Sequence, residues 1–146
     1  MKIIDGLIGG LAGAISITLI HELVRKAYPG APRLDKLGEQ ATAKLIGKAT
    51  GEHPKEKDLY GPVMAGELIA NALYYGLAAA NSKHPVKTAG ALGITAGLGA
   101  INLPSKMGLK DEYAAGTLQR KIITVGLYTL GGVIAGTVVN FFRNRN

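Results

Sequence analysis

Several residue types are missing or scarce in this sequence, and each absence narrows what the protein can be. There is no cysteine, so a disulfide framework, a cysteine-ligated zinc site and a thiol nucleophile are excluded. There is no tryptophan, and charged residues make up only 18% of the 146 residues. Long apolar runs together with so few charges disfavour a disordered polybasic tail. A small helical membrane protein and an unusually apolar soluble bundle remain.

Four apolar segments are present, and most approach the length that a membrane-crossing helix needs. A helix needs about 20 residues to cross the ~30 Å hydrocarbon core of a bilayer. The first segment contains an uncharged run from Gly6 to Ile20, and the third is short and consists mostly of glycine and alanine. We expect membrane spans at 3–24, 62–81, 88–103 and 122–142.

These segments predict an all-α fold, an integral membrane bundle of four transmembrane helices that forms a single domain over 1–146. Small residues four apart recur in every segment, and in lipid such residues allow helix backbones to approach closely. A soluble bundle would need polar stripes at helical spacing. The last segment offers little beyond threonine and asparagine, so the membrane interpretation is preferred.

Basic residues are unevenly distributed between the segments, and this asymmetry predicts an orientation. The chain has 17 Lys and Arg against 10 Asp and Glu, a formal net charge of +7. Twelve of the basic residues lie in the two larger loops, 25–61 and 104–121, and five lie on the other side. Loops rich in Lys and Arg stay in the cytoplasm. We therefore expect a multi-pass protein with cytoplasmic larger loops and both termini outside.

The first large loop contains a segment over about 33–49 whose pattern predicts an amphipathic helix. Leucine, isoleucine and alanine fall on one face at helical spacing, and lysine falls on the other. Two interpretations remain open, a helix seated at the lipid headgroups and a cap packed on the ends of the bundle. In the first interpretation, the basic residues that contact anionic headgroups are Arg33, Lys36, Lys44 and Lys48.

Ionisable residues within the spans are the candidate functional residues, because each costs about 2.5–3.5 kcal/mol at a helix centre. Glu67 is the foremost, since Asn71 and Tyr74 follow it on the same helical face. The first span leaves the membrane where the second enters, so the polar end of the first lies at a similar depth. We expect one polar intramembrane cluster, made of Glu67, Asn71, Tyr74, Tyr75, His21, Glu22 and Arg25. Arg25 would pair with Glu67 or with Glu22.

Three functions are compatible with such a cluster. The preferred one is a structural or accessory membrane protein, without enzyme activity, that self-associates or binds a membrane partner. In this function the polar cluster only holds the helices together through hydrogen bonds and ion pairs. The first alternative is a proton- or cation-coupled transporter or channel that uses Glu67 and His21. The second is a membrane-embedded enzyme that acts on a lipid, with Glu22 or Glu67 as general base.

We expect the lipid bilayer as a partner of this chain, and we expect no metal, cofactor or nucleic acid. The His21–Glu22 pair lacks a second histidine four residues after the first, because Arg25 occupies that position. The other two histidines lie in separate loops, and the glycine-rich runs lie inside spans. The basic residues flank the membrane rather than forming a nucleic-acid surface.

Two stretches, HELVRKAYPGAPRLDKLGEQ and LYGPVMAGELIANALYYGL, resemble small uncharacterised multi-helix proteins of the bacterial inner membrane. The resemblance covers about the first 80 residues. It implies a bacterial inner-membrane location. It brings no activity, cofactor or catalytic residue with it.

Overall fold

The computed structural model describes residues 2–145, and every element within them is a helix, so the predicted all-α class is confirmed. The long helices are α1 (Lys2–Ala27), α3 (Tyr60–Asn81), α4 (Pro85–Lys106) and α6 (Leu118–Arg143). The shorter elements are α2 (Leu34–Thr50), the 3-10 helix η1 (Glu56–Leu59) and α5 (Glu112–Ala115).

Three of the helical segments are long and apolar enough to cross a membrane, namely Ile3–Ala27, Glu56–Asn81 and Leu118–Arg143. They contain the predicted spans at 3–24, 62–81 and 122–142. The fourth predicted span, 88–103, lies within α4, which is as long as α3 but is not among the three. The reason is its composition, because glycine and alanine add little apolar character. Length and composition therefore support three of the four predicted spans.

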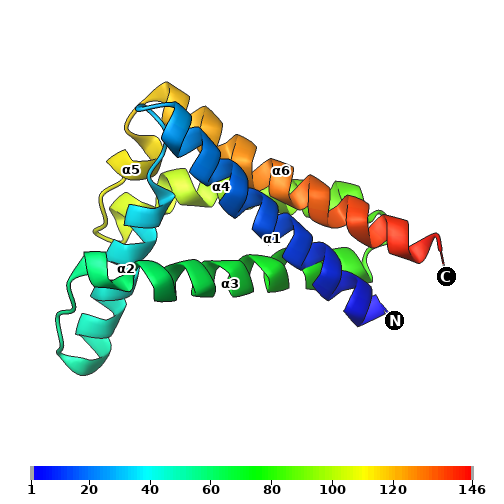
Figure 1. Cartoon of the computed structure of the whole chain (residues 1–146), viewed down its shortest axis with the longest axis horizontal. Coiled ribbons are helices and arrows are strands. Elements are labelled where there is room, and N and C mark those ends of the chain that lie inside the picture. The colour runs from blue at the N-terminus through cyan, green and yellow to red at the C-terminus, as the bar shows by residue number, and fades with distance from the viewer. Residues whose placement is uncertain (1, 146) are drawn as a thin grey trace.

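The long helices run side by side, with α1 packed on both α3 and α6, and α6 packed in turn on α4 (Figure 1). Although α3 and α4 follow one another in the chain, each packs mainly against a different helix. Both chain termini lie at one end of the bundle, and α2 and α5 lie at the other (Figure 1). This arrangement leaves space between α3 and α4 near the α2 end.

Glycine makes the close helix contacts possible. At Gly10 of α1, an added Cβ would stand 1.9 Å from the carbonyl oxygen of Ala72 on α3. At Gly13 it would stand 2.4 Å from the carbonyl oxygen of Gly131 on α6. Contacts this close between backbones leave no room for a side chain. The glycines that bring α4 and α6 together in the same way are Gly93, Gly97, Gly132 and Gly136.

Polar contacts at both ends of α6 involve side chains at or next to its first and last residues. At its N-terminus the Thr117 side chain accepts a hydrogen bond from the Arg120 backbone N–H at 3.1 Å. At its C-terminus Arg143 donates to the carbonyl oxygens of Ala80 and Ser82. The last carbonyls of α3 have no partner within their own helix, and a cation complements the negative end of the helix dipole. Arg143 therefore joins α6 to the turn between α3 and α4.

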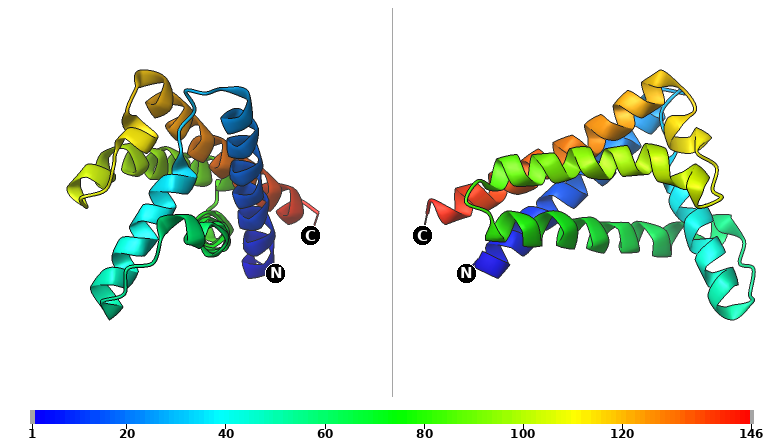
Figure 2. Two further views of the ribbon diagram at one scale, coloured as in Figure 1. Left: turned by 60° about the vertical axis from the view of Figure 1, so that its left-hand side comes forward. Right: turned by 180° about the vertical axis from the view of Figure 1, so that it is seen from behind.

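The amphipathic segment predicted over 33–49 corresponds to α2 to within one residue. Its first two turns pack on the end of the bundle, where Leu34, Asp35 and Glu39 are buried. Its second half projects beyond the bundle (Figure 2), and Leu45 there is 68% exposed. The first half is thus a cap on the bundle.

Candidate ligand-binding groove

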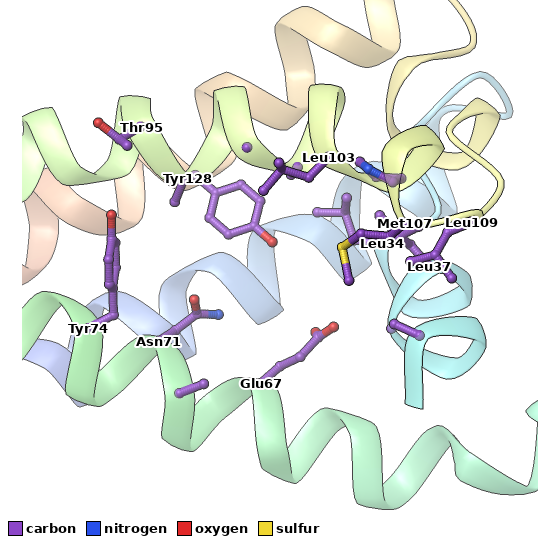
Figure 3. A pocket seen from close by; sticks show the side chains of 17 residues that line it. Leu34, Leu37, Glu67, Asn71, Tyr74, Thr95, Leu103, Met107, Leu109 and Tyr128 are labelled. Carbon is purple, nitrogen blue, oxygen red and sulfur yellow. The ribbon is translucent and has the colours of Figure 1, made fainter. Parts of the chain in front are cut away.

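An open groove of roughly 560 Å³ lies between α3 and α4 (Figure 3). The first turns of α2 and the segment after α4 close one end of it, and Tyr128 of α6 contributes to its floor. Its walls consist mostly of aliphatic and small side chains from α2, α3 and α4, which include Leu34, Leu37, Ala96, Ala100, Leu103 and Met107. We call this feature the α3–α4 groove.

Among the described residues that line the groove, Glu67 alone carries a charge. No hydrogen bond or ion pair joins its carboxylate to any other residue of the described chain. On its α2 side the carboxylate lies against Gly38, where an added Cβ would stand 2.5 Å from Glu67 Oε1. Glycine at position 38 therefore provides the space that the carboxylate occupies.

Two further polar groups, the Asn71 amide and the Tyr128 hydroxyl, project into the same space as Glu67 (Figure 3). Neither side chain forms a hydrogen bond within residues 2–145. Tyr74 and Thr95 also line the groove, but their hydroxyls donate to the carbonyls of Leu92 and Ala91. The other polar side chains that bond back to a carbonyl four residues earlier in the long helices are Ser16, Thr18, Asn81, Asn102, Thr129 and Thr137. The carboxylate, the amide and the phenol differ from these because their hydrogen-bonding capacity is unused.

Tyr75 lies outside the groove, although we predicted it in the same cluster as Glu67. Its side chain is 0% exposed, and its hydroxyl donates to the backbone carbonyl of Tyr128 at 3.0 Å. Its ring meets the ring of Tyr74 edge to face. Tyr75 therefore connects α3 to α6 and holds the backbone that presents Tyr128 to the groove.

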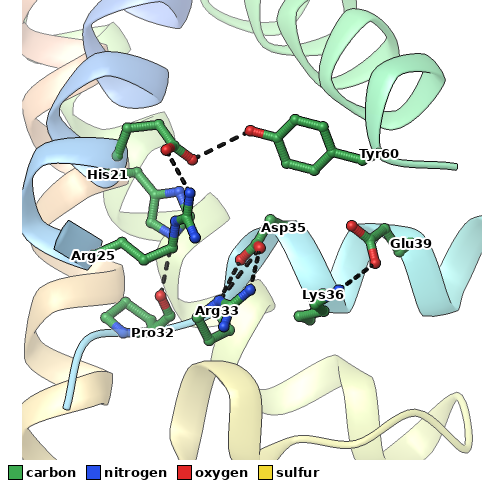
Figure 4. A network of polar contacts seen from close by, with 9 residues as sticks. His21, Arg25, Pro32, Arg33, Asp35, Lys36, Glu39 and Tyr60 are labelled. Atoms are coloured by element: carbon green, nitrogen blue, oxygen red, sulfur yellow. Dashed lines mark hydrogen bonds and ion pairs between the residues drawn. The ribbon is translucent and has the colours of Figure 1, made fainter. Parts of the chain in front are cut away.

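The remaining three predicted residues form a second polar group where α1 ends (Figure 4). Arg25 pairs with Glu22 at 2.6 Å, the second of its two predicted partners, and Tyr60 donates to the same carboxylate at 3.4 Å. His21 is 5% exposed, and its Nε2 lies 3.0 Å from the carbonyl oxygen of Pro32. The residues predicted as one cluster thus divide into a groove group on α3, a junction group at the end of α1, and Tyr75 in the contact between α3 and α6.

The start of α2 carries two ion pairs that pattern analysis did not predict. Arg33 donates to Asp35 through Nε at 3.0 Å and Nη2 at 2.7 Å, and Lys36 donates to Glu39 at 3.0 Å (Figure 4). Burial by itself would raise the pKa of Asp35, but the hydrogen bonds and the charge of Arg33 outweigh burial and lower this pKa. The same hydrogen bonds raise the pKa of Arg33.

These pairs bear on the four basic residues predicted to contact lipid headgroups. Arg33 and Lys36 are engaged by acids of their own helix, and Lys44 donates to the carbonyls of Met107 and Gly108. Lys48 is exposed and forms no hydrogen bond or ion pair within the described chain. A headgroup contact stays a prediction, and Lys48 is the residue most open to one.

Within residues 2–145, no three His, Asp or Glu side chains lie close enough together to hold a metal ion. Comparison of the chain with protein-family models, with curated proteins and with solved structures finds no match. The chemistry of the groove is therefore the basis for assigning a function. That chemistry consists of one carboxylate, one amide and one phenol in an otherwise apolar space.

Tyr128 and Gly38 contribute to the surroundings of Glu67 but had not been predicted as site residues. Tyr128 had a signal in the sequence, because it is the only aromatic residue of α6 before the two phenylalanines at its end. Gly38 had none, because its importance depends on the tertiary contact with Glu67.

Proposed function

We propose that this chain is a small integral membrane protein that binds an amphiphilic molecule in the α3–α4 groove. It acts as an accessory or binding module, without catalysis, in the bacterial inner membrane. Its four spans are α1, α3, α4 and α6, and its larger loops lie in the cytoplasm. The single observation that carries the binding function is the unpaired Glu67 carboxylate in an open, mostly apolar groove.

The topology of the chain supports α4 as a fourth span. α3 ends beside the C-terminus of the chain, where Arg143 donates to Ala80 and Ser82. α6 starts at the other end, where Arg120 donates to the carbonyl of Gly30 just after α1. If α3 and α6 both cross the membrane, α4 has to return between these ends. Its 22 residues extend about 33 Å at 1.5 Å per residue, enough for the crossing.

The surroundings of Glu67 favour ligand binding over a purely structural role. A carboxylate that serves as glue between helices is paired or hydrogen-bonded, because an unpaired buried charge is costly. Glu67 has no such partner in the described chain, whereas Glu22, Asp35 and Glu39 each have one. The groove volume lies within the range of about 300–1,000 Å³ typical of ligand pockets. Since the groove lies between the flanks of two spans, we infer that it opens sideways to the bilayer, where amphiphiles are concentrated.

The two alternative functions have less support. A proton- or cation-coupled transporter would use Glu67 together with His21, but His21 belongs to the junction group and faces the carbonyl of Pro32. An enzyme that acts on lipid through Glu22 would need that carboxylate free, and Arg25 and Tyr60 engage it. Neither His21 nor Glu22 lines the apolar groove next to Glu67.

The binding function is tested by filling the groove. We expect native mass spectrometry of the protein, released from nanodiscs of phosphatidylethanolamine and phosphatidylglycerol, to show about one retained amphiphile per chain. Ala100→Leu places a larger side chain in the groove and should abolish retention. Gly126→Leu is the matched control, because nothing lies within 4 Å of a Cβ at that position of α6. The proposal is overturned if the wild type retains no more amphiphile than Ala100→Leu does while both unfold at the same temperature.

A further inference from the structure

We propose that the polar head of the ligand in the α3–α4 groove is an ammonium group, so that the ligand is a single-chain organic cation such as a protonated alkylamine. This inference rests on the proposed function and specifies the chemical class of the ligand. It starts from the charges around Glu67 and from the kind of hydrogen-bonding groups beside it.

Three basic residues in or next to α2, near the groove, are already engaged. At the α2 end, Arg33 is bound to Asp35 at 2.7 Å and Lys36 to Glu39 at 3.0 Å. Lys44 donates to two backbone carbonyls after α4. Among the described residues that line the groove, none is Lys or Arg. When it is ionised, Glu67 therefore has no cation beside it in the groove, and a cationic ligand would neutralise its charge.

The hydrogen-bonding groups favour an ammonium over other polar heads. An ionised carboxylate only accepts hydrogen bonds, whereas an ammonium has three donors and no acceptor. The amide oxygen of Asn71 and the hydroxyl oxygen of Tyr128 supply two further acceptors in the space that Glu67 faces. Hydrogen bonds in which the donor or the acceptor is ionised are about twice as strong as neutral ones. A hydroxyl head offers one donor, and a carboxylate or phosphate head would be repelled by Glu67.

The walls of the groove determine the rest of the ligand. From Glu67 the groove extends along α4 past small and aliphatic side chains, among them Ala96, Gly99 and Leu103. These side chains give an alkyl chain an apolar surface and form no hydrogen bond with it. A volume of roughly 560 Å³ suits one molecule of about drug size, which favours a single-chain amphiphile over a two-chain lipid.

Three twelve-carbon probes with different heads test this inference, namely dodecylammonium, dodecanol and dodecanoate. Each is titrated into protein in nanodiscs, and binding is measured by native mass spectrometry with Ala100→Leu protein as background. We expect the wild type to bind dodecylammonium about tenfold more tightly than dodecanol, a difference of about 1.4 kcal/mol, and dodecanoate least. In Glu67→Gln the preference for the amine should fall below about twofold, with dodecanol binding unchanged. Glu67→Asp should keep part of the preference because it keeps the charge.

Glu22→Gln is the matched control, because it removes a carboxylate of the junction group that is already paired with Arg25. It should leave the amine preference intact. Equal binding of dodecylammonium and dodecanol by the wild type would overturn the ammonium inference and leave the binding function standing. If no probe binds above the Ala100→Leu background, both proposals fail. A dimer that Ala100→Leu dissociates and dodecylammonium does not would show that a second copy of the chain fills the groove, and would overturn both.

Discussion

Acidic side chains at the α2 end of the bundle illustrate, residue by residue, how this chain accommodates charge. Glu22, Asp35 and Glu39 each have a basic partner within three positions in the sequence. Glu67 has none nearby in sequence and none in space among residues 2–145. The paired acids find their charge partners nearby in the sequence, whereas a partner for Glu67 has to come from a molecule that enters the groove. The same distinction separates structural charge from the charge to which we assign a function.

The Arg33–Asp35 pair predicts a pH-dependent contribution to stability. The pKa of Asp35 is lowered in the folded protein, so its contribution is present above the unfolded pKa of about 3.9 and is lost as the pH falls through the lower folded value. We expect Asp35→Asn to cost about 1–3 kcal/mol of unfolding free energy at pH 6, the range for hydrogen bonds to charged groups. The cost should shrink towards zero below about pH 3. Denaturant titrations of both proteins across this range measure the effect.

Asp58→Asn provides the comparison for that experiment, because Asp58 is exposed and no ion pair joins it to another described residue. Its unfolding free energy should differ from that of the wild type by less than about 0.5 kcal/mol at every pH, as expected for an isolated surface substitution. A cost of Asp35→Asn that stays constant down to pH 2 would mean that the carboxylate contributes through its shape rather than its charge.

Site residues were predictable from sequence only as far as they share one helix. The spacing of Glu67, Asn71 and Tyr74 places them on one face of α3, and the structure places all three at the groove. The spacing gave no means of knowing which face of α1 would turn towards them. Pro32, whose carbonyl oxygen faces His21, lies in the turn between α1 and α2. A turn has no periodic residue pattern, so the sequence did not predict this contact.

At the scale of elements, helix positions follow from the apolar runs, but helix contacts follow from where glycine lies. On α3, the two glycines at 66 and 76 have opposite surroundings. A Cβ at Gly76 would stand 2.3 Å from the carbonyl oxygen of Gly6 on α1, and a Cβ at Gly66 would have nothing within 4 Å. The sequence pattern does not distinguish these two glycines, because each is followed four residues later by another small residue. Only the packing separates the glycine that is required from the one that is free.

These two glycines give a prediction within a single helix. Gly76→Ala should destabilise the bundle by about 1–3 kcal/mol, the usual cost of overpacking, because backbone rather than a flexible side chain blocks the new methyl group. Gly66→Ala should be neutral or stabilising by up to about 1 kcal/mol, since alanine favours helix more than glycine does. Thermal unfolding in one detergent, followed by circular dichroism at 222 nm, compares them. Equal losses in both variants would show that the α1–α3 contact has room for a methyl group at position 76.

At the scale of the whole molecule, the sequence predicts the helices but not the groove. Apolar runs are local and set the helix count and class, whereas the groove exists because α3 and α4 pack mainly on α1 and α6 instead of on each other. This packing depends on which glycines of the four helices lie opposite one another in the folded chain. Local composition and the proposed topology differ at α4. Its glycine and alanine content weakens it as a span, whereas the four-span topology that we propose needs it to cross.

The absence of cysteine makes the topology directly testable with single introduced thiols. Lys48, Lys83 and Lys110 are exposed and lie after the start of α2, between α3 and α4, and after α4. In intact bacterial cells a membrane-impermeant maleimide should label Lys83→Cys alone, and permeabilisation should add Lys48→Cys and Lys110→Cys. Labelling of positions 83 and 110 from the same side would mean that α4 does not cross, and the four-span topology would fall. Labelling of positions 48 and 110 alone in intact cells would show the opposite orientation and contradict the prediction from the basic loops. The crossing of α4 would still be supported, because only a helix that traverses the bilayer has its two ends on opposite sides.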